Sequence, residues 1–284
     1  GGNYNTVVGD EAGTAITTGD NNVAIGFNAG DAITDGKENI AIGSQALTTN
    51  TLGQRAVAIG YYALNAQTNT AGVNTYNTAV GALAGEKVTI GVQNTLIGAL
   101  AGDALTDSDF NTAVGHLALS SDTLGSRSTA IGMNTLRDQN FTSATETYNV
   151  AVGHGAGLLV TTGVQNTLIG GLAGDALTSS VGNVAVGYLS LSAATTADLN
   201  TAIGHRALTT NILSDRNVAL GYAALSTHNL SSNADGYNVG IGYNAGGAVT
   251  TGVENTLIGG LAGDALTDAD YNTAIGSLAL TTDT

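Results

Sequence analysis

The sequence predicts an all-β fold in which about sixteen short coils stack into a parallel β-solenoid, or β-roll. The pattern Asn-[Thr/Val]-Ala-[Ile/Val]-Gly recurs along the whole chain, with a step of 17 residues in most places and of 21 residues in three. Within each copy the side chains alternate as in a β-strand. A short fixed period means that one unit cannot bury its apolar face alone and must stack on its neighbours.

The glycine that closes each copy, here called the anchor glycine, marks the coils. The anchor glycines are Gly9, Gly26, Gly43, Gly60, Gly81, Gly98, Gly115, Gly132, Gly153, Gly170, Gly187, Gly204, Gly221, Gly242, Gly259 and Gly276. We expect one continuous repeat array over residues 1–284, a fragment of a longer fibre, with the longer steps dividing it into groups at about 1–76, 77–148, 149–237 and 238–284. The extra residues of those steps predict surface loops, which are either binding knobs or insertions without a role.

Composition excludes several functional classes. The chain has a net charge of −15 and only seven Lys and Arg residues, too few to neutralise a nucleic-acid backbone, so no nucleic-acid partner is expected. The longest apolar run is too short to span a membrane, and the N-terminal residues do not resemble a signal peptide. The acidic surface is interpreted as a solvated exterior that keeps the protein soluble.

The strand of each coil is apolar on both sides. In the copy that ends at Gly26, Val23 and Ile25 point one way and Ala24 points the other. The same contrast between two large outer residues and one small middle residue recurs along the chain. A strand that is apolar on both faces is buried on both faces, so one face lines the core of the coil and the other meets a partner.

The second half of the coil predicts a core position that is filled from either of two places. The fourth residue after the anchor glycine is Gly or Leu, and a large aliphatic residue stands at the seventh place only when the fourth is Gly. The aliphatic residues are Ile16, Ile33, Val88, Leu105, Val160, Leu177, Val249 and Leu266; the alternatives are Asn50, Gln67, Asp122, Gln139, Ala194, Asn211, His228 and Asp283. Such conservation of volume is typical of close packing. A frequent Thr at the eighth place predicts a second strand, and hence a flattened roll of two sheets.

The pattern Asn-Val-Ala-Ile-Gly-x-x-Ala resembles the head repeat of trimeric autotransporter adhesins, and its longer form with a following Leu and a Thr-rich turn resembles repeats of phage tail-fibre and surface-fibre proteins. The resemblance implies a left-handed parallel β-roll in which the small middle residues pack three copies around an axis. An exposed ladder of this kind would also exceed the apolar patches that soluble monomers tolerate. We therefore expect a homotrimer, with a monomeric solenoid as the alternative. The interface candidates are Ala24, Ala41, Ala58, Ala79, Leu96, Ala113, Ala130, Ala151, Leu168, Ala185, Ala202, Ala219, Leu257 and Ala274.

Aromatic residues gather at the first place after the anchor glycine. Four successive coils carry Tyr188, His205, Tyr222 and Tyr243 there. If this place faces water, stacking of the coils makes an aromatic strip with a spacing of about 4.8 Å. Because aromatic faces stack on sugar rings, the strip is a candidate for contact with glycans or a receptor. The alternative is packing at a seam between subunits.

Two groups of aspartates have a spacing that could serve calcium: Asp103, Asp107 and Asp109, and again Asp264, Asp268 and Asp270. Solvated turns are the favoured interpretation of both groups. His116, His154 and His205 share one place in the coil and could meet around a trimer axis, but no metal is expected there. Catalysis finds no support, because the chain has no cysteine and no Ser/His/Asp group stands out. Neither enzymatic activity nor a cofactor is expected.

The expected function is structural. The repeat array predicts the shaft or head of an extracellular or virion fibre, at a cell surface or as a virion tail fibre, that attaches to surface receptors or glycans. One alternative is a self-assembling extracellular filament, in which coils join end to end through open sheet edges. A second alternative is an ice-binding solenoid.

Overall fold

The computed structural model describes residues 2–69 and 71–282, and it has the predicted architecture: an all-β parallel β-solenoid of about sixteen turns. No helix occurs in these residues, so none could cross a membrane. The chain divides into two compact units, Gly1–Thr147 and Tyr148–Thr284. Each unit is a stack of coils.

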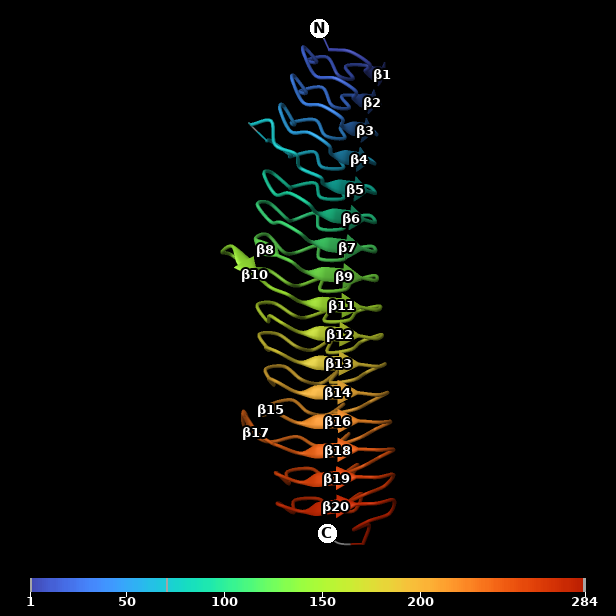
Figure 1. Cartoon of the computed structure of the whole chain (residues 1–284), viewed down its shortest axis with the longest axis vertical. Helices are drawn as coiled ribbons and strands as arrows, with labels where there is room; N and C mark the ends of the chain where they lie inside the picture. The colour runs from blue at the N-terminus through green and yellow to red at the C-terminus, as the bar shows by residue number, and fades with distance from the viewer. Residues whose placement is uncertain (1, 70, 283–284) are drawn as a thin grey trace. The chain divides into compact units, whose positions relative to one another are not determined.

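In the first unit each coil contributes one three-residue strand to a single parallel sheet (Figure 1). Consecutive strands pair without any shift, so that Val23, Ala24 and Ile25 lie opposite Ile40, Ala41 and Ile42. Equivalent residues therefore form columns along the stack. The strands are β1 (Thr6–Val8), β2 (Val23–Ile25), β3 (Ile40–Ile42), β4 (Val57–Ile59), β5 (Thr78–Val80), β6 (Thr95–Ile97), β7 (Thr112–Val114) and β9 (Thr129–Ile131).

The second unit repeats this arrangement. Thr201, Ala202 and Ile203, for example, lie opposite Val218, Ala219 and Leu220 of the next coil. Its sheet consists of β11 (Val150–Val152), β12 (Thr167–Ile169), β13 (Val184–Val186), β14 (Thr201–Ile203), β16 (Val218–Leu220), β18 (Val239–Ile241), β19 (Thr256–Ile258) and β20 (Thr273–Ile275).

In the three-residue strands from β2 onward, the middle residue, which is Ala in most copies and Leu or Gly in the others, is buried in the interior of its own coil. The fourteen residues expected at a trimer interface are 0% exposed within the single chain, except Ala274 at 4%. Their flanking residues, such as Val23 and Ile25, point outward and are partly exposed. This placement corrects the assignment of faces, because a side chain without exposed surface is not available to a second copy. The open face of the sheet carries the larger β-branched residues.

The anchor glycine is required by backbone conformation and by a close approach between coils. Gly26 has φ +128°, and a Cβ added there would lie 2.8 Å from the carbonyl carbon and oxygen of Gly43 in the next coil. An L-residue other than glycine rarely adopts this φ, and no neighbour can move aside because the obstacle is backbone. The glycine column therefore sets the spacing at the end of every strand.

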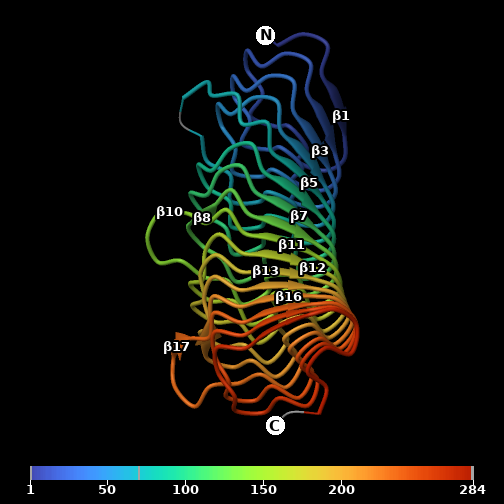
Figure 2. The same ribbon diagram turned by 60° about the horizontal axis from the view of Figure 1, so that its bottom comes forward.

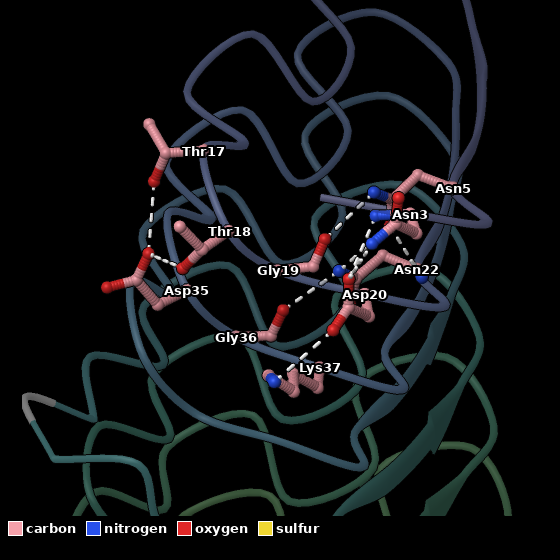
Figure 3. Close-up of polar contacts among 10 residues, drawn as sticks. All are labelled: Asn3, Asn5, Thr17, Thr18, Gly19, Asp20, Asn22, Asp35, Gly36 and Lys37. Carbon is pink, nitrogen blue, oxygen red and sulfur yellow. Dashed lines mark hydrogen bonds and ion pairs between the residues drawn. The ribbon is translucent and has the colours of Figure 1, made fainter. Parts of the chain in front are cut away.

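The asparagine before the strand forms a ladder of hydrogen bonds from coil to coil. Figure 3 shows its first rungs, where Asn5 Nδ2 donates to Gly19 O and Asn22 Nδ2 donates to Gly36 O, both at 2.8 Å. The backbone N–H of Asn22 donates in turn to Asn5 Oδ1 at 2.8 Å. Each side chain thus satisfies a backbone group of its neighbour. A hydrogen bond of this kind contributes about 1 kcal/mol net, and an orphaned buried group costs more.

The alternative filling of one core position is confirmed. A Cβ at Gly30 would lie 2.9 Å from Ile33 Cδ1, and one at Gly102 would lie 2.8 Å from Leu105 Cδ1. Where the fourth residue is Leu, as at Leu47, that side chain is fully buried instead. Leu and a large aliphatic residue cannot both be accommodated, since interiors are packed to the density of organic crystals.

The prediction of a second strand around the Thr at the eighth place after the anchor glycine is wrong. The threonines at the eighth place are bonded from coil to coil, as where Thr17 N–H donates to Thr34 O at 3.0 Å, but the backbone there bends. Among the described residues, further short strands occur only around two of the longer steps: β8 (Gly125–Ser126) pairs with β10 (Thr145–Glu146), and β15 (Ser214–Asp215) pairs with β17 (Ala234–Asp235). These loops project on the side of the coil away from the main sheet (Figures 1 and 2).

In coils whose fourth residue after the anchor glycine is Leu, the seventh residue, where the structure describes it, is a buried polar side chain, except at Ala194. Asn211 and Asp122 bond to the backbone three residues on, at Ser214 and Gly125. Gln139 Nε2 donates to Asp122 Oδ2 at 2.6 Å, and burial raises the pKa of the Asp122 carboxyl. Asp283, at the same place in the last coil, lies outside the described residues. These groups brace the corner of the coil, because each satisfies backbone groups that would otherwise be orphaned.

Candidate functional site

The aromatic strip of the second unit is built by the turn that follows each strand. The anchor glycine turns the chain outward, and the next residue is therefore exposed. The second residue after the anchor glycine is held by a hydrogen bond to the previous coil. The backbone N–H of Arg206 donates to Tyr188 O at 3.0 Å, and that of Ala223 donates to His205 O at 3.0 Å. The backbone thus places four rings one above another.

The four predicted rings stack. The ring centroids of Tyr188 and His205 are 5.5 Å apart, those of His205 and Tyr222 are 5.2 Å apart, and those of Tyr222 and Tyr243 are 5.3 Å apart. The pairs His205–Tyr222 and Tyr222–Tyr243 are nearly parallel, with interplanar angles of 2° and 11°. Stacked aromatic rings at this separation attract one another, so each ring is held by its neighbours.

The strip is nevertheless open to solvent. Tyr188, Tyr222 and Tyr243 are 50%, 48% and 59% exposed, and His205 is also exposed. Exposed aromatic rings are costly to leave in water and are enriched where a protein binds a partner. Rings held in one orientation lose little conformational entropy when a ligand binds, which favours binding.

A pocket of about 300 Å³ adjoins the strip at Tyr222. Its lining is Leu189, Arg206, Thr209, Thr210, Tyr222, Ala223, Ser226 and Thr227. Thr210 Oγ1 donates to Ser226 O at 2.8 Å and Thr227 Oγ1 donates to Gly247 O at 2.7 Å, so these hydroxyl oxygens retain lone pairs as acceptors. The pocket combines an aromatic wall, hydroxyl acceptors and one guanidinium.

The other residues at this place in the coil do not join a strip. Phe27 and Tyr61 are exposed, but Ser44 stands between them in the intervening coil. His116 and His154 are exposed and belong to different units. Within the described residues only the second unit brings four rings into a continuous stack.

A feature that sequence analysis missed lies at the longer steps. The fifth residue before the anchor glycine is an Arg in the coil before each insertion, and it lies over an aromatic ring. Arg127 Cζ is 4.7 Å from the centroid of Phe110, Arg55 Cζ is 5.8 Å from that of Tyr76, and Arg216 Cζ is 6.0 Å from that of Tyr237. The regular recurrence of Arg before each longer step was a signal that could have found it.

Two of these arginines also hold their insertions by ion pairs, whereas Arg55 pairs with Glu38 of the preceding coil. Arg127 Nε is 3.0 Å from Glu146 Oε1, and Arg216 pairs with Asp235. In the first unit, Asp107, Asp109, Phe110 and Arg127 contribute to a second pocket of about 300 Å³. The pairs are partly exposed, so solvent screens the attraction and each pair contributes little to stability.

The calcium candidates are spread over different parts of the coil. Asp109 Oδ1 accepts the N–H of Val92 and Asp270 Oδ1 accepts that of Val253, each at 2.7 Å, while Asp268 bonds to Thr267. Asp103 is partly buried and burial raises the pKa of its carboxyl; Asp264 occupies the equivalent place, and Asp107 lines the pocket beside Arg127. Across residues 2–69 and 71–282, no three acidic, His or Cys side chains gather closely enough to hold a metal ion.

Comparison with known proteins adds no assignment. No protein-family model matches the chain, and no curated protein is significantly similar to it in sequence.

Proposed function

We propose that this chain is a segment of an extracellular or virion fibre, its shaft or head, that attaches to glycans through the strip of Tyr188, His205, Tyr222 and Tyr243. The observation that carries the proposal is the exposure of four rings held in a stack at 5.2 to 5.5 Å. The apolar faces of sugar rings fit such a surface, and the hydroxyl acceptors beside Tyr222 suit sugar hydroxyl groups.

The stacked coils suit a mechanical role as well. Each coil is tied to the next by strand pairing, by the asparagine ladder and by the threonine column, so that a local opening must break several bonds at once. Such a repeat gives a stiff support on which a binding surface keeps its geometry.

The proposal is tested by glycan-array binding of the whole chain and of the variant Tyr222→Ala. Wild type should bind a subset of glycans, and Tyr222→Ala should lose about ten-fold in affinity or more, because removing the ring interrupts the stack and one wall of the pocket. The matched control is Tyr61→Ala, which removes an exposed ring at the same place in the first unit. Absence of any glycan binding by wild type, or equal binding by Tyr222→Ala, would refute the proposal.

We propose further that the fibre is a homotrimer and that the outward face of the main sheet is the contact. In the second unit this face presents Ile169, Ile203 and Leu220, exposed by 38%, 36% and 45%, beside a column of Val and Thr without charged side chains. A sheet face that is apolar and open is a candidate for contact with other copies. The left-handed roll implied by the sequence resemblance belongs to the same proposal.

Mass measurement in solution tests the homotrimer. A particle near three times 28.1 kDa supports it, a monomer refutes it, and polydisperse assemblies that grow with concentration would favour the filament. Ile203→Glu should break the trimer, since it places a charge on the outward face. Tyr61→Glu, which adds a charge at an exposed turn, is the control and should leave the mass unchanged.

Ice binding is kept as a second candidate because of one observation. Thr78, Thr95, Thr112 and Thr129 form an unbroken outward rank in the first unit, in register from β5 to β9. A flat, regular rank of Thr beside Val and Ile matches what an ice surface needs. Thermal hysteresis in wild type that is lost in Thr95→Asp would establish this function; freezing at the ordinary point would dismiss it.

A further inference from the structure

The pocket beside Tyr222 contains an arginine that the rest of the fold does not use. Four of the five arginines have a carboxylate within 4.0 Å: Arg55, Arg127, Arg137 and Arg216. Arg206 has no side-chain partner among the residues that the structure describes. In a chain with 22 acidic and seven basic residues, an arginine left without an acidic partner is unexpected.

The backbone fixes the place of Arg206. Its φ of +60° puts it at a left-handed corner, its N–H donates to Tyr188 O at 3.0 Å, and its carbonyl accepts a bond from Thr209 Oγ1 at 2.6 Å. The residue is exposed and lines the pocket together with Tyr222. The guanidinium therefore belongs to the wall of a cavity rather than to a structural ion pair.

The surroundings of Arg206 are free of the carboxylates that occupy the same columns elsewhere. The fifth residue after the anchor glycine is Asp175 and Asp264 in coils before and after the strip, whereas the four coils between carry Ser192, Thr209, Ser226 and Gly247. A protein of net charge −15 thus presents a local positive charge at this pocket. A negatively charged ligand group is attracted here and repelled over most of the surface.

We infer that the strip binds glycans that carry a carboxylate, such as oligosaccharides of uronic or sialic acid, with the sugar face on Tyr222 and the carboxylate on the guanidinium of Arg206. This inference rests on the proposed glycan binding. The planar guanidinium presents paired N–H donors that match the two oxygens of a carboxylate. The oxygens of Thr210 and Thr227 accept from sugar hydroxyl groups on the other side of the pocket.

The experiment compares carboxylated oligosaccharides with their carboxyl-reduced, neutral counterparts, for both uronic and sialic acids, by titration against the whole chain. Wild type should prefer the carboxylated member about ten-fold at low salt, with the preference falling as ionic strength rises. Arg206→Gln should lose the preference and keep its affinity for the neutral member within about two-fold. Arg206→Lys should keep only part of it, since a point charge lacks the paired donors.

The matched control is Arg137→Gln, which removes an arginine paired with Asp138 in the first unit and should leave both affinities unchanged. If wild type binds glycans without preferring the carboxylated member, or prefers sulfated sugars, the inference is overturned while the glycan function stands. If wild type binds no glycan, both are overturned. Equal preference in Arg206→Gln and wild type also overturns the inference.

Discussion

The two units share one coil geometry but place different side chains in the same columns. After the anchor glycine, successive coils of the first unit carry Phe27, Ser44 and Tyr61, whereas those of the second carry Tyr188, His205, Tyr222 and Tyr243. Only the second set stacks into a surface. In this repeat a stacked aromatic surface needs a ring in each successive coil, because a ring that lacks a ring neighbour is only an exposed residue.

The interior shows a second contrast at one place in the coil. In the first unit Asp122 accepts a hydrogen bond there from Gln139 of the following coil, and in the second unit Asn211 and His228 of the following coil both bond to Ser214. His228 Nε2 is 2.9 Å from Ser214 Oγ. An acid in one unit and a base in the other predict opposite responses to pH.

The largest effect should come from a charge on the inward face of the sheet. Ala202→Glu and Ala113→Glu each bury a carboxylate where Ala is 0% exposed, and we expect several kcal/mol of destabilisation of the unit concerned. Thr201→Glu, one residue away and outward, should cost less than about 1 kcal/mol. Hydrogen exchange measured by mass spectrometry reports each unit separately. Equal loss of protection in Ala202→Glu and Thr201→Glu would contradict the assignment of faces.

Acid should destabilise the second unit through His228. Burial lowers the pKa of its imidazole from 6.5 to about 4. Between these values the unfolded chain binds a proton that the folded chain does not, so stability is lost as pH falls from about 6.5 towards about 4, by about 3 kcal/mol. His228→Asn, which copies the residue at Asn211, should remove this dependence. Urea unfolding of both proteins at several pH values is the measurement.

The first unit should respond in the opposite direction through Asp122. Because burial raises the pKa of its carboxyl, the folded chain keeps a proton that the unfolded chain has lost above pH 3.8. Stability is therefore lost as pH rises from 3.8 through the folded pKa. In Asp122→Asn the protection of first-unit amides should no longer fall over this range, while the second unit keeps its own profile. A first unit whose protection rises with pH in wild type would show that another group dominates.

The smallest effect should come from completing the interrupted column. Ser44→Tyr places a ring between Phe27 and Tyr61, and three contiguous rings should give the first unit weak affinity for glycans. The gain is best seen in a Tyr222→Ala background, where we expect recovery of a few-fold in binding. Ser44→Leu, equally apolar but without a flat ring face, is the control. If both variants bind alike, hydrophobic area rather than stacking explains the strip.

Much of the fold could be predicted because the same steric requirements recur in successive copies of the repeat. Ile33 excludes a large side chain at the place of Gly30 for steric reasons, and this exclusion recurs in the sequence as a regular alternation of residue types. The sequence could not decide whether the side chain of Ala24 points into the coil or out of it. Alternation along a strand shows which side chains share a face of the sheet, but not which face lines the interior. The structure settles the interior: Leu96 of the strand and Leu105 of the following turn both reach within 2.8 Å of a Cβ built at Gly102, so the middle residue of the strand and the seventh residue after the anchor glycine share one core.

The candidate site was predicted in part. Contiguity of Tyr188, His205, Tyr222 and Tyr243 follows from the period, and so does their stacking. The pocket at Arg206 does not, because it depends on a left-handed corner and on threonine hydroxyls turned back to the chain. The pairing of Arg127 with Glu146 was likewise hidden, since it joins two residues 19 positions apart, which a period of 17 residues does not bring together.

The backbone bonds of the asparagine and threonine columns join residues 17 or 21 positions apart, as where Thr17 N–H meets Thr34 O. When such a chain is pulled from one end, the bonds of the outermost turn break first, because that turn has a neighbouring coil on one side only. Each turn then peels away separately and releases about 55 Å of extended chain, at about 3.3 Å per residue. Unfolding in many small steps, rather than in one rupture, suits the proposed role as a fibre that stays attached under flow.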